Sequence, residues 1–179
     1  MNAALIVIDM QNDFVRLNGA LYVPGAEQTI PVIQNLLVES KKSAIPIVFT
    51  TDFHSVNDPE FERWPVHCVA NSNGAEIVSE LNAANTEIVK QNQHDKFPGT
   101  QLEGFLRGKK IDTLFFCGVA TEYCVAFTAK TALAKGFNVF ILIDAIKPVN
   151  EADGAKVLVE LQEKGAELIE CDSFPKLSR

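Results

Sequence analysis

The sequence predicts one α/β domain built around a parallel sheet, and three observations carry this prediction. Short apolar runs alternate along the chain with segments of helical period. The runs are apolar on both faces, as in strands covered by helices on each side. Gly136 and Gly165 stand where a helix would end before the next strand. With 179 residues, 47% of them hydrophobic, the chain 1–179 is expected to bury one core.

The first half of the chain supplies three of the six expected strands. The aliphatic run ALIVID predicts a strand over 4–9, and an amphipathic helix over 28–42 leads to a second strand at 46–52, PIVFTTD. Residues 53–73 form one long connection, and loops of this length in a compact domain are often functional. A shorter amphipathic segment, 74–81, is predicted to be helical and precedes a strand at 87–90, EIVK.

The second half repeats this alternation with the remaining strands. A helix over 101–107 precedes the strand 113–118, TLFFCG. A helix over 121–135 ends before the strand 138–144, NVFILID, and a helix over 151–164 ends before the strand 166–171, AELIEC. Each pair has the order helix, turn, strand that a parallel sheet requires.

Charge and the N-terminus exclude several classes of partner. The net charge is −7, with no run of basic residues, so nucleic acid is not the expected partner. The opening segment has no basic region, and Asp9 interrupts its apolar stretch, so it is not a signal peptide. No segment approaches the roughly 20 apolar residues that cross a bilayer. We therefore expect a cytoplasmic protein, in which the four cysteines are free thiols without C-x-x-C spacing.

Ionisable and nucleophilic residues follow the predicted strands where ligands bind in open parallel sheets. Asp9 ends the first strand, Asp52 and His54 end the second, Lys90 ends the third, and Cys124 follows the fourth. So many reactive groups at one edge exceed what solubility requires. The sequence therefore predicts a catalytic site there.

Cys124 is the candidate nucleophile among the four cysteines. Thr121 is the expected N-cap of the following helix, which would place Cys124 in its first turn, where the helix dipole lowers a thiol pKa. The alternative is that Cys124 fills an apolar helix face. Cys117, inside a strand, is expected to be inert core, and Cys68 and Cys171 have no comparable setting.

The loop after the second strand carries a candidate metal site. Asp52 and His54 are two residues apart and share a face, and His67 follows in the same loop. A carboxylate with two imidazoles suits zinc, iron or manganese. Spacing alone also permits a structural reading, and it does not choose between Glu60 and Glu62 as a further ligand.

Asp9 and Lys90 both follow aliphatic residues and would need partners if buried. One reading is a structural ion pair between them. The other is that the pair serves the Cys124 thiol. Asp144, which ends the fifth strand, is interpreted as a residue that caps or braces a loop.

Four segments together resemble the isochorismatase-like cysteine hydrolase family, and most closely its nicotinamidase branch. They are LIVIDMQNDF with GALYVPGA, TTDFHSVNDPEFERWPVHC, EIVKQNQHDKFPGTQLEGFL and FCGVATEYCV, and they span nearly the whole chain. The resemblance implies a three-layer α/β/α fold with a six-stranded parallel sheet of order 3-2-1-4-5-6. It also implies a cis peptide at Val119–Ala120 and a homo-oligomer.

The resemblance implies hydrolysis of nicotinamide to nicotinate and ammonia, a step of NAD salvage, through a thioester on Cys124. Asp9 would exchange the proton, Lys90 would hold Asp9, and the backbone N–H groups of Ala120 and Cys124 would bind the oxyanion. The family often has an aromatic residue and a serine or alanine before this lysine segment's Phe-x-Gly-Thr, but here the run is His94-Asp95-Lys96-Phe97. Lys96 is thus a rival, although the motif favours Lys90.

The resemblance also implies the ligands and cofactor of the site. A divalent ion, zinc first and iron or manganese as alternatives, would be held by Asp52, His54 and His67, with Glu60 as a possible fourth ligand. Phe14, Trp64 and Val119 would contact a small aromatic amide.

Three alternatives remain. They are a metal-free isochorismatase, an amidase for another small carboxamide such as pyrazinamide-like or carbamoyl compounds, and a non-catalytic binding protein of the same fold. The candidate metal ligands in the loop after the second strand argue against a metal-free isochorismatase. The joint presence of Asp9, Lys90 and Cys124 argues against a non-catalytic binding protein.

Overall fold

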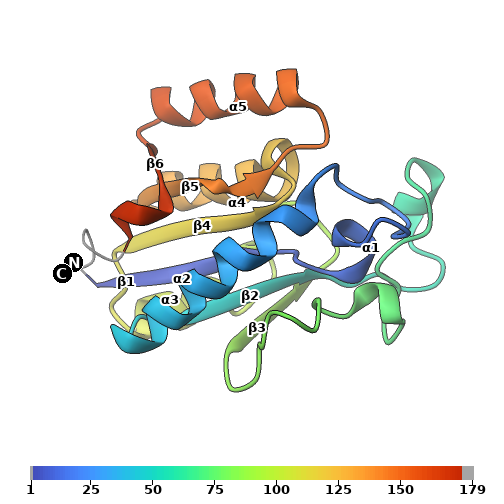
Figure 1. Ribbon diagram of the computed structural model, residues 1–179, viewed down its shortest axis with the longest axis horizontal. Helices are drawn as coiled ribbons and strands as arrows, with labels where there is room; N and C mark the ends of the chain where they lie inside the picture. Colours follow the sequence, from blue (N-terminus) through green and yellow to red (C-terminus); the bar gives the residue numbers. More distant parts are fainter. Residues whose placement is uncertain (1, 175–179) are drawn as a thin grey trace.

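A six-stranded parallel sheet lies between two layers of helices in the computed structural model, which describes residues 2–174 (Figure 1). The strand order is β3-β2-β1-β4-β5-β6, as the resemblance implied. The strands are β1 (Ala3–Ile8), β2 (Ile47–Asp52), β3 (Glu87–Gln91), β4 (Thr113–Val119), β5 (Asn138–Lys147) and β6 (Glu167–Ile169). The predicted fold class is confirmed.

The helices divide between the two faces of the sheet. They are α1 (Asn12–Val15), α2 (Ile30–Lys42), α3 (Leu102–Gly108), α4 (Ala126–Ala134) and α5 (Glu151–Glu163). Residues of α1 and α2 share one hydrophobic cluster with the sheet, and residues of α3, α4 and α5 share the other. Short 3₁₀ turns cover 26–29, 59–62, 73–75 and 171–173, and a π-type turn covers Thr121–Val125.

The two-residue period of β1 explains why its whole sequence is apolar. Ala3, Leu5 and Val7 pack into the cluster that includes α2. Ala4, Ile6 and Ile8 pack into the cluster on the opposite face. Both faces of this strand are buried, which favours apolar side chains along its whole length, and the polar residue Asp9 comes where the strand ends.

The predicted helix over 74–81 is wrong. Only the 3₁₀ turn Asn73–Ala75 forms there. Backbone pairing with the segment after β1 replaces helical hydrogen bonds, because Ile77 makes an antiparallel bridge with Gln11 and the Val78 N–H donates to the Met10 carbonyl at 2.9 Å. The buried side chains of Val78 and Leu81 gave the segment a helix-like pattern without a helix.

The side chain of Gln11 ties the ends of β1 and β2 together. Its amide nitrogen donates to the Asp52 carbonyl at 2.8 Å, and its amide oxygen accepts from the Asp52 N–H at 2.7 Å. The side chain thus reproduces both hydrogen bonds of a paired strand residue. It fixes Asp52 relative to the end of β1.

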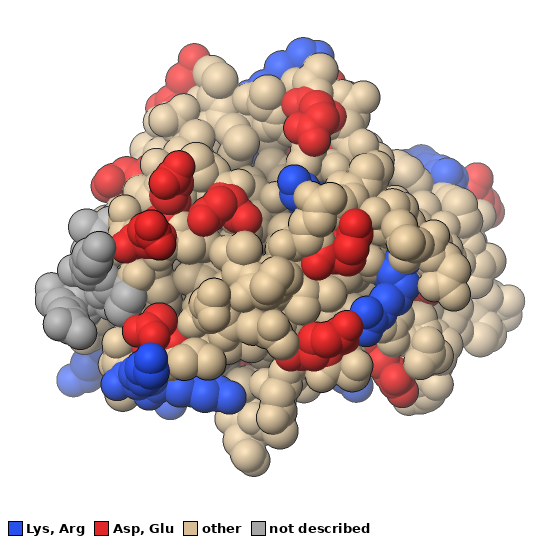
Figure 2. Space-filling model, viewed as in Figure 1, with Lys and Arg blue, Asp and Glu red and all other residues tan. Residues whose placement is uncertain are grey.

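Acidic groups are spread over the face of the molecule in Figure 2, and several basic groups lie together along its lower left edge. Among the described residues, no helix combines the length and apolarity that crossing a bilayer requires.

Asp144 braces the end of the fold, as expected, by accepting the Cys171 N–H at 2.9 Å.

Candidate active site

A buried carboxylate and a buried thiol meet because β1 and β4 are neighbours. Ile8 pairs with Gly118 at the ends of these strands, so Asp9 and the turn that follows β4 leave the sheet side by side. Side-chain ligand atoms of Asp9, Asp52 and Cys124 all lie within 4.8 Å of one another. The convergence of acid and thiol predicted from strand order is therefore present.

Asp9 is held in one orientation by the neighbouring strand β2. The Thr50 hydroxyl donates to one Asp9 carboxylate oxygen at 2.6 Å, and the Asp9 N–H donates to the Thr50 hydroxyl oxygen at 3.3 Å. Asp9 has a φ of 47°, in the left-handed region that Asp tolerates better than most residues. Thr50 was missed from the sequence, where it reads as an ordinary strand residue.

The lysine that reaches Asp9 is Lys96, not Lys90. Lys96 Nζ lies 2.8 Å from Asp9 Oδ2 and 2.5 Å from Asp52 Oδ1, and the residue is fully buried. Its backbone is fixed as well, because its N–H donates to the Thr128 hydroxyl at 3.2 Å and its carbonyl accepts from the Thr100 hydroxyl at 2.7 Å.

The prediction that Lys90 reaches Asp9 is wrong, and strand alternation explains why. In β3, Val89 pairs with Thr50 and Gln91 pairs with Asp52, so those side chains share the face on which the site lies. Lys90 pairs with Thr51 and points to the opposite face, where its Nζ lies 4.2 Å above the Phe53 ring.

Burial dominates the proton affinities of these groups. It raises the pKa of the Asp9 carboxyl above its ordinary value, with the Lys96 ammonium opposing the shift. Burial also raises the pKa of Cys124, again against the pull of Lys96. The two carboxylates outweigh burial for Lys96 and raise its pKa, so it remains an ammonium. The resting group at Cys124 is thus a thiol, and a nucleophilic thiolate requires a base beside it.

The expected cap of the turn after β4 is also wrong. Thr121 makes no capping bond, and its buried hydroxyl has no hydrogen-bond partner. The Ala120 carbonyl instead accepts the N–H groups of Tyr123 at 3.1 Å and Val125 at 3.2 Å. Cys124 still lies in the first turn, but burial overrides the lowering of its pKa that a helix N-terminus favours. The Val119–Ala120 peptide is cis, as the resemblance implied.

Cys117 lies in the interior of β4, as expected of a core residue. It is fully buried, its thiol lies 3.7 Å from the Ile6 carbonyl oxygen, and burial raises its pKa. Cys117 is therefore separate from the reactive group.

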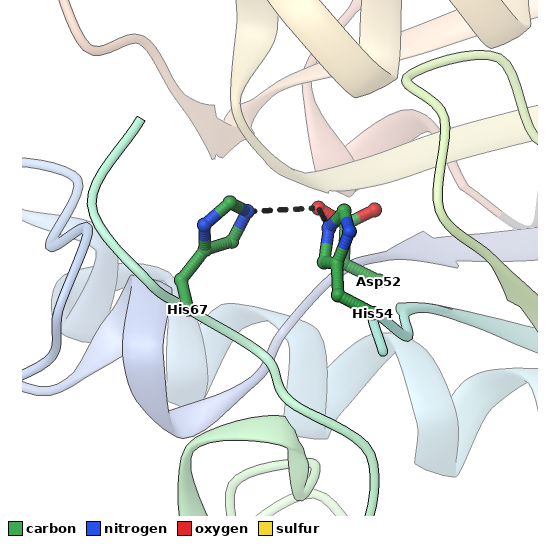
Figure 3. A group of neighbouring side chains, drawn as sticks. All are labelled: Asp52, His54 and His67. Carbon is green, nitrogen blue, oxygen red and sulfur yellow. Dashed lines mark ion pairs between the residues drawn. The ribbon is translucent and has the colours of Figure 1, made fainter. Parts of the chain in front are cut away.

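Asp52 also faces two histidines, and together the three residues form a candidate metal centre. Figure 3 shows both imidazoles directed at the Asp52 carboxylate. Asp52 Oδ2 lies 3.6 Å from His54 Nε2 and 3.7 Å from His67 Nε2, and the three ligand atoms fall within 4.8 Å of one another. These separations are too long for good hydrogen bonds and leave room for an ion between the groups.

The donor atoms fit a divalent metal. His54 Nδ1 lies 3.1 Å from Asp58 Oδ2, whereas the buried Nε2 has no hydrogen-bond partner among the described residues, an unfavourable state unless a ligand satisfies it. His67 Nδ1 lies 2.8 Å from the Pro65 carbonyl, a contact that favours the tautomer with a free lone pair on Nε2. Glu60 has a carboxylate oxygen within 4.8 Å of ligand atoms of His54 and Asp58, whereas Glu62 is exposed.

A pocket of about 250 Å³ connects the metal-ligand set to the thiol. Its walls carry Phe14, Trp64, Val119, Ala120 and Cys124, together with Asp52, Glu60 and His67. Phe14 packs on His67 with 5.6 Å between ring centroids, and Trp64 meets Tyr123 edge-on at 5.7 Å. A small aromatic molecule in this pocket would touch both the Cys124 thiol and the His67 imidazole.

Sequence reasoning missed two further residues of this pocket, His94 and Tyr123. Both line it beside Cys124. His94 precedes the lysine by two residues, a position noted above only as a departure from the family pattern. Tyr123 is adjacent to the nucleophile in sequence, which was the available signal.

Comparisons with known proteins agree with this geometry. The family model for the isochorismatase domain matches residues 3–173. A nicotinamidase of Acinetobacter baylyi is 32% identical, with 83% of each chain covered. An N-carbamoylsarcosine amidase of Arthrobacter is 31% identical over 77% of this chain and 56% of its own length. The crystal structure of a Pyrococcus horikoshii pyrazinamidase in complex with zinc has a TM-score of 0.90 and 37% identity, covering 95% of this chain and 99% of that one.

Proposed function

Because the chain belongs to the isochorismatase family of hydrolases, we propose that it is a nicotinamidase, converting nicotinamide to nicotinate and ammonia as one domain spanning 1–179. The observation that carries the proposal is the joint presence, around one pocket, of a buried Cys124–Asp9–Lys96 cluster and an Asp52–His54–His67 cluster. The first suits nucleophilic acyl transfer, and the second suits a metal-assisted hold on a heteroaromatic ring.

In the proposed acylation step, Asp9 takes the proton of the Cys124 thiol, and the sulfur attacks the carboxamide carbon. Lys96, bound to Asp9, keeps positive charge beside the forming thiolate. The backbone N–H groups of Ala120 and Cys124 stabilise the oxyanion, a role in which one donor is worth about 10²–10³ in rate. Asp9 then gives its proton to the departing ammonia, leaving a thioester that water hydrolyses.

Asp52, His54 and His67, with Glu60 as a possible fourth ligand, would hold a divalent ion, and zinc is the ion bound to the Pyrococcus horikoshii relative. When bound, the ion supplies a Lewis-acid site for the pyridine nitrogen and thereby orients the ring. Phe14 and Trp64 would flank that ring, and Val119 would complete the wall.

Cys124→Ala is expected to abolish ammonia release from nicotinamide while leaving the fold intact, because it removes only the attacking sulfur. Ammonia would be measured by a coupled assay, and the free energy of unfolding by urea titration. Cys117→Ala is the matched control and should keep activity. Turnover by Cys124→Ala at the parent rate would refute the thioester mechanism.

Removing metal with a chelator should lower activity, and zinc, iron or manganese should restore it. An activity-independent measurement accompanies this one: adding zinc to chelator-treated protein should raise Tm, since a ligand that binds the native state stabilises it. His67→Ala should lose the Tm shift, whereas a variant of the exposed Glu62 should keep it. If the chelator-treated protein keeps full activity and added zinc leaves its Tm unchanged, a metal-free hydrolase is favoured instead.

The substrate itself is tested by a panel of amides, with the Arthrobacter relative as the reason to include N-carbamoyl amino acids. Nicotinamide and pyrazinamide should be cleaved with the higher kcat/KM. A clear preference for the carbamoyl compound would move the assignment to another amidase of the same family.

A further inference from the structure

We propose that His94 is a further catalytic residue, the general base that activates water for hydrolysis of the Cys124 thioester; this rests on the proposed amidase function. His94 Nδ1 lies 3.8 Å from Cys124 Sγ. The imidazole also lines the pocket in which a substrate would lie. It is therefore the histidine that touches the reacting sulfur, whereas His54 and His67 belong to the metal-ligand set.

The ring of His94 contacts two aromatic side chains. Its centroid lies 5.3 Å from that of Tyr123 and 5.6 Å from that of Phe127, both at tilted angles. These contacts limit rotation of the imidazole. The edge that carries Nδ1 is consequently kept toward the sulfur.

The backbone of His94 is fixed to helix α4 as well. The Thr128 hydroxyl donates to the His94 carbonyl at 3.3 Å and accepts the Lys96 N–H at 3.2 Å. The Thr131 hydroxyl donates to the intervening Asp95 carboxylate at 2.6 Å. One helix thus sets the positions of His94 and Lys96 relative to Cys124, as a proton-transfer group requires.

His94 is more accessible from the pocket than Asp9 is. Asp9 is 0% exposed and is absent from the pocket's lining residues, whereas His94 is half-buried and among them. A carboxylate oxygen of Asp9 lies within 4.8 Å of the Cys124 sulfur, and of these two residues only Cys124 lines the cavity. Water that attacks the thioester enters through the cavity, where it meets the imidazole.

The proposed step balances without an external reagent. His94, with its proton on Nε2, accepts a proton from water at Nδ1 while the water oxygen bonds to the acyl carbon. The C–S bond then breaks, and the imidazolium returns the proton to the Cys124 sulfur. The products are the carboxylic acid and the free thiol, so His94 ends as it began.

The experiment is rapid-quench kinetics with saturating nicotinamide on the metal-loaded parent, His94→Asn and His94→Phe. Asparagine keeps a polar group near Nδ1 but is no base, and phenylalanine keeps the stacking. Both variants should release one equivalent of ammonia per site in a burst and then turn over about 10²–10⁴-fold more slowly than the parent, the usual worth of a general base. Intact mass spectrometry should find the nicotinoyl group on Cys124.

Hydroxylamine should restore turnover of the variants, because it is a stronger nucleophile than water and depends less on a base. Lys90→Met is the control: Lys90 points away from the site and lies over the Phe53 ring, so this variant should show no accumulated thioester.

Failure of the inference and failure of the proposed function give different results. Suppose that the parent is active. If the His94 variants then lose the ammonia burst, or if they turn over as fast as the parent, His94 is not the base of thioester hydrolysis. If the parent itself releases no ammonia from nicotinamide, the proposed function is overturned and the inference with it. Because asparagine and phenylalanine differ in shape, a folding defect in one His94 variant would leave the other to test the inference.

Discussion

Lys96→Met is expected to lower ammonia release from nicotinamide by about 10²–10⁴-fold, the range for loss of a group that serves proton transfer. Lys96 Nζ contacts both Asp9 and Asp52, and methionine fills the same volume without charge. Breaking a buried pair by removing one partner is also expected to reduce the free energy of unfolding by about 3–5 kcal/mol. Activity would be followed by ammonia release and stability by urea titration.

Lys90→Met is the control, because Lys90 is exposed and lies over the Phe53 ring away from the site. It should change stability by no more than about 0.5 kcal/mol and leave turnover at the parent level. A double variant separates charge from packing: adding Asp9→Asn to Lys96→Met removes one stranded carboxylate and should recover stability without activity. Equal losses in the two lysine variants would contradict the assignment of Lys96.

Gly118→Ala is expected to cause the largest loss of stability among the glycine-to-alanine substitutions of the chain. A Cβ at this position would lie 2.0 Å from the Ile8 carbonyl oxygen, and the φ of 107° is one that side chains rarely adopt. Since the neighbour is backbone of β1, nothing can move aside. We expect a loss of at least about 4 kcal/mol, or no soluble folded protein, measured by denaturant unfolding.

Gly104→Ala in helix α3 is the matched control, since its added Cβ has no neighbour within 4 Å. It should stabilise the protein by about 0.5–1 kcal/mol through helix propensity. Parent-like stability of Gly118→Ala would show that β1 and β4 are not as close at their ends as the structure places them.

The α/β class was predictable because the strands read as short apolar runs that alternate with helical segments, a signal that needs no knowledge of partners. The strand order came only from the resemblance to the family. The site residues that directly end strands, Asp9 and Asp52, were predictable from the same apolar runs. The segment 74–81 was not, because its buried Val78 and Leu81 imitate helical spacing while their backbone pairs with residues after β1.

The lysine of the candidate site shows where sequence reasoning fails. Lys90 lies in β3 and Lys96 follows it, and only the alternation within β3, with Val89 inward, decides that Lys90 points away. Lys96 reaches the site from an irregular loop whose path is set by Thr128 and Thr100, hydrogen bonds that no periodicity encodes. The role of His94 depends in the same way on that loop, because its contact with Cys124 spans 30 positions of the chain.

The paired hydrogen bonds between Gln11 and Asp52 have a mechanical consequence. They hold the ends of the neighbouring strands β1 and β2 together, so the carboxylates of Asp9 and Asp52 cannot separate unless both hydrogen bonds break. Any opening that admits substrate must then come from the rim, where the segment from Ala20 to Val23 and Val149 border the cavity. Movement that admits a ligand would therefore occur in the residues that border the pocket entrance. The hydrogen-bonded ends of β1 and β2 would stay fixed.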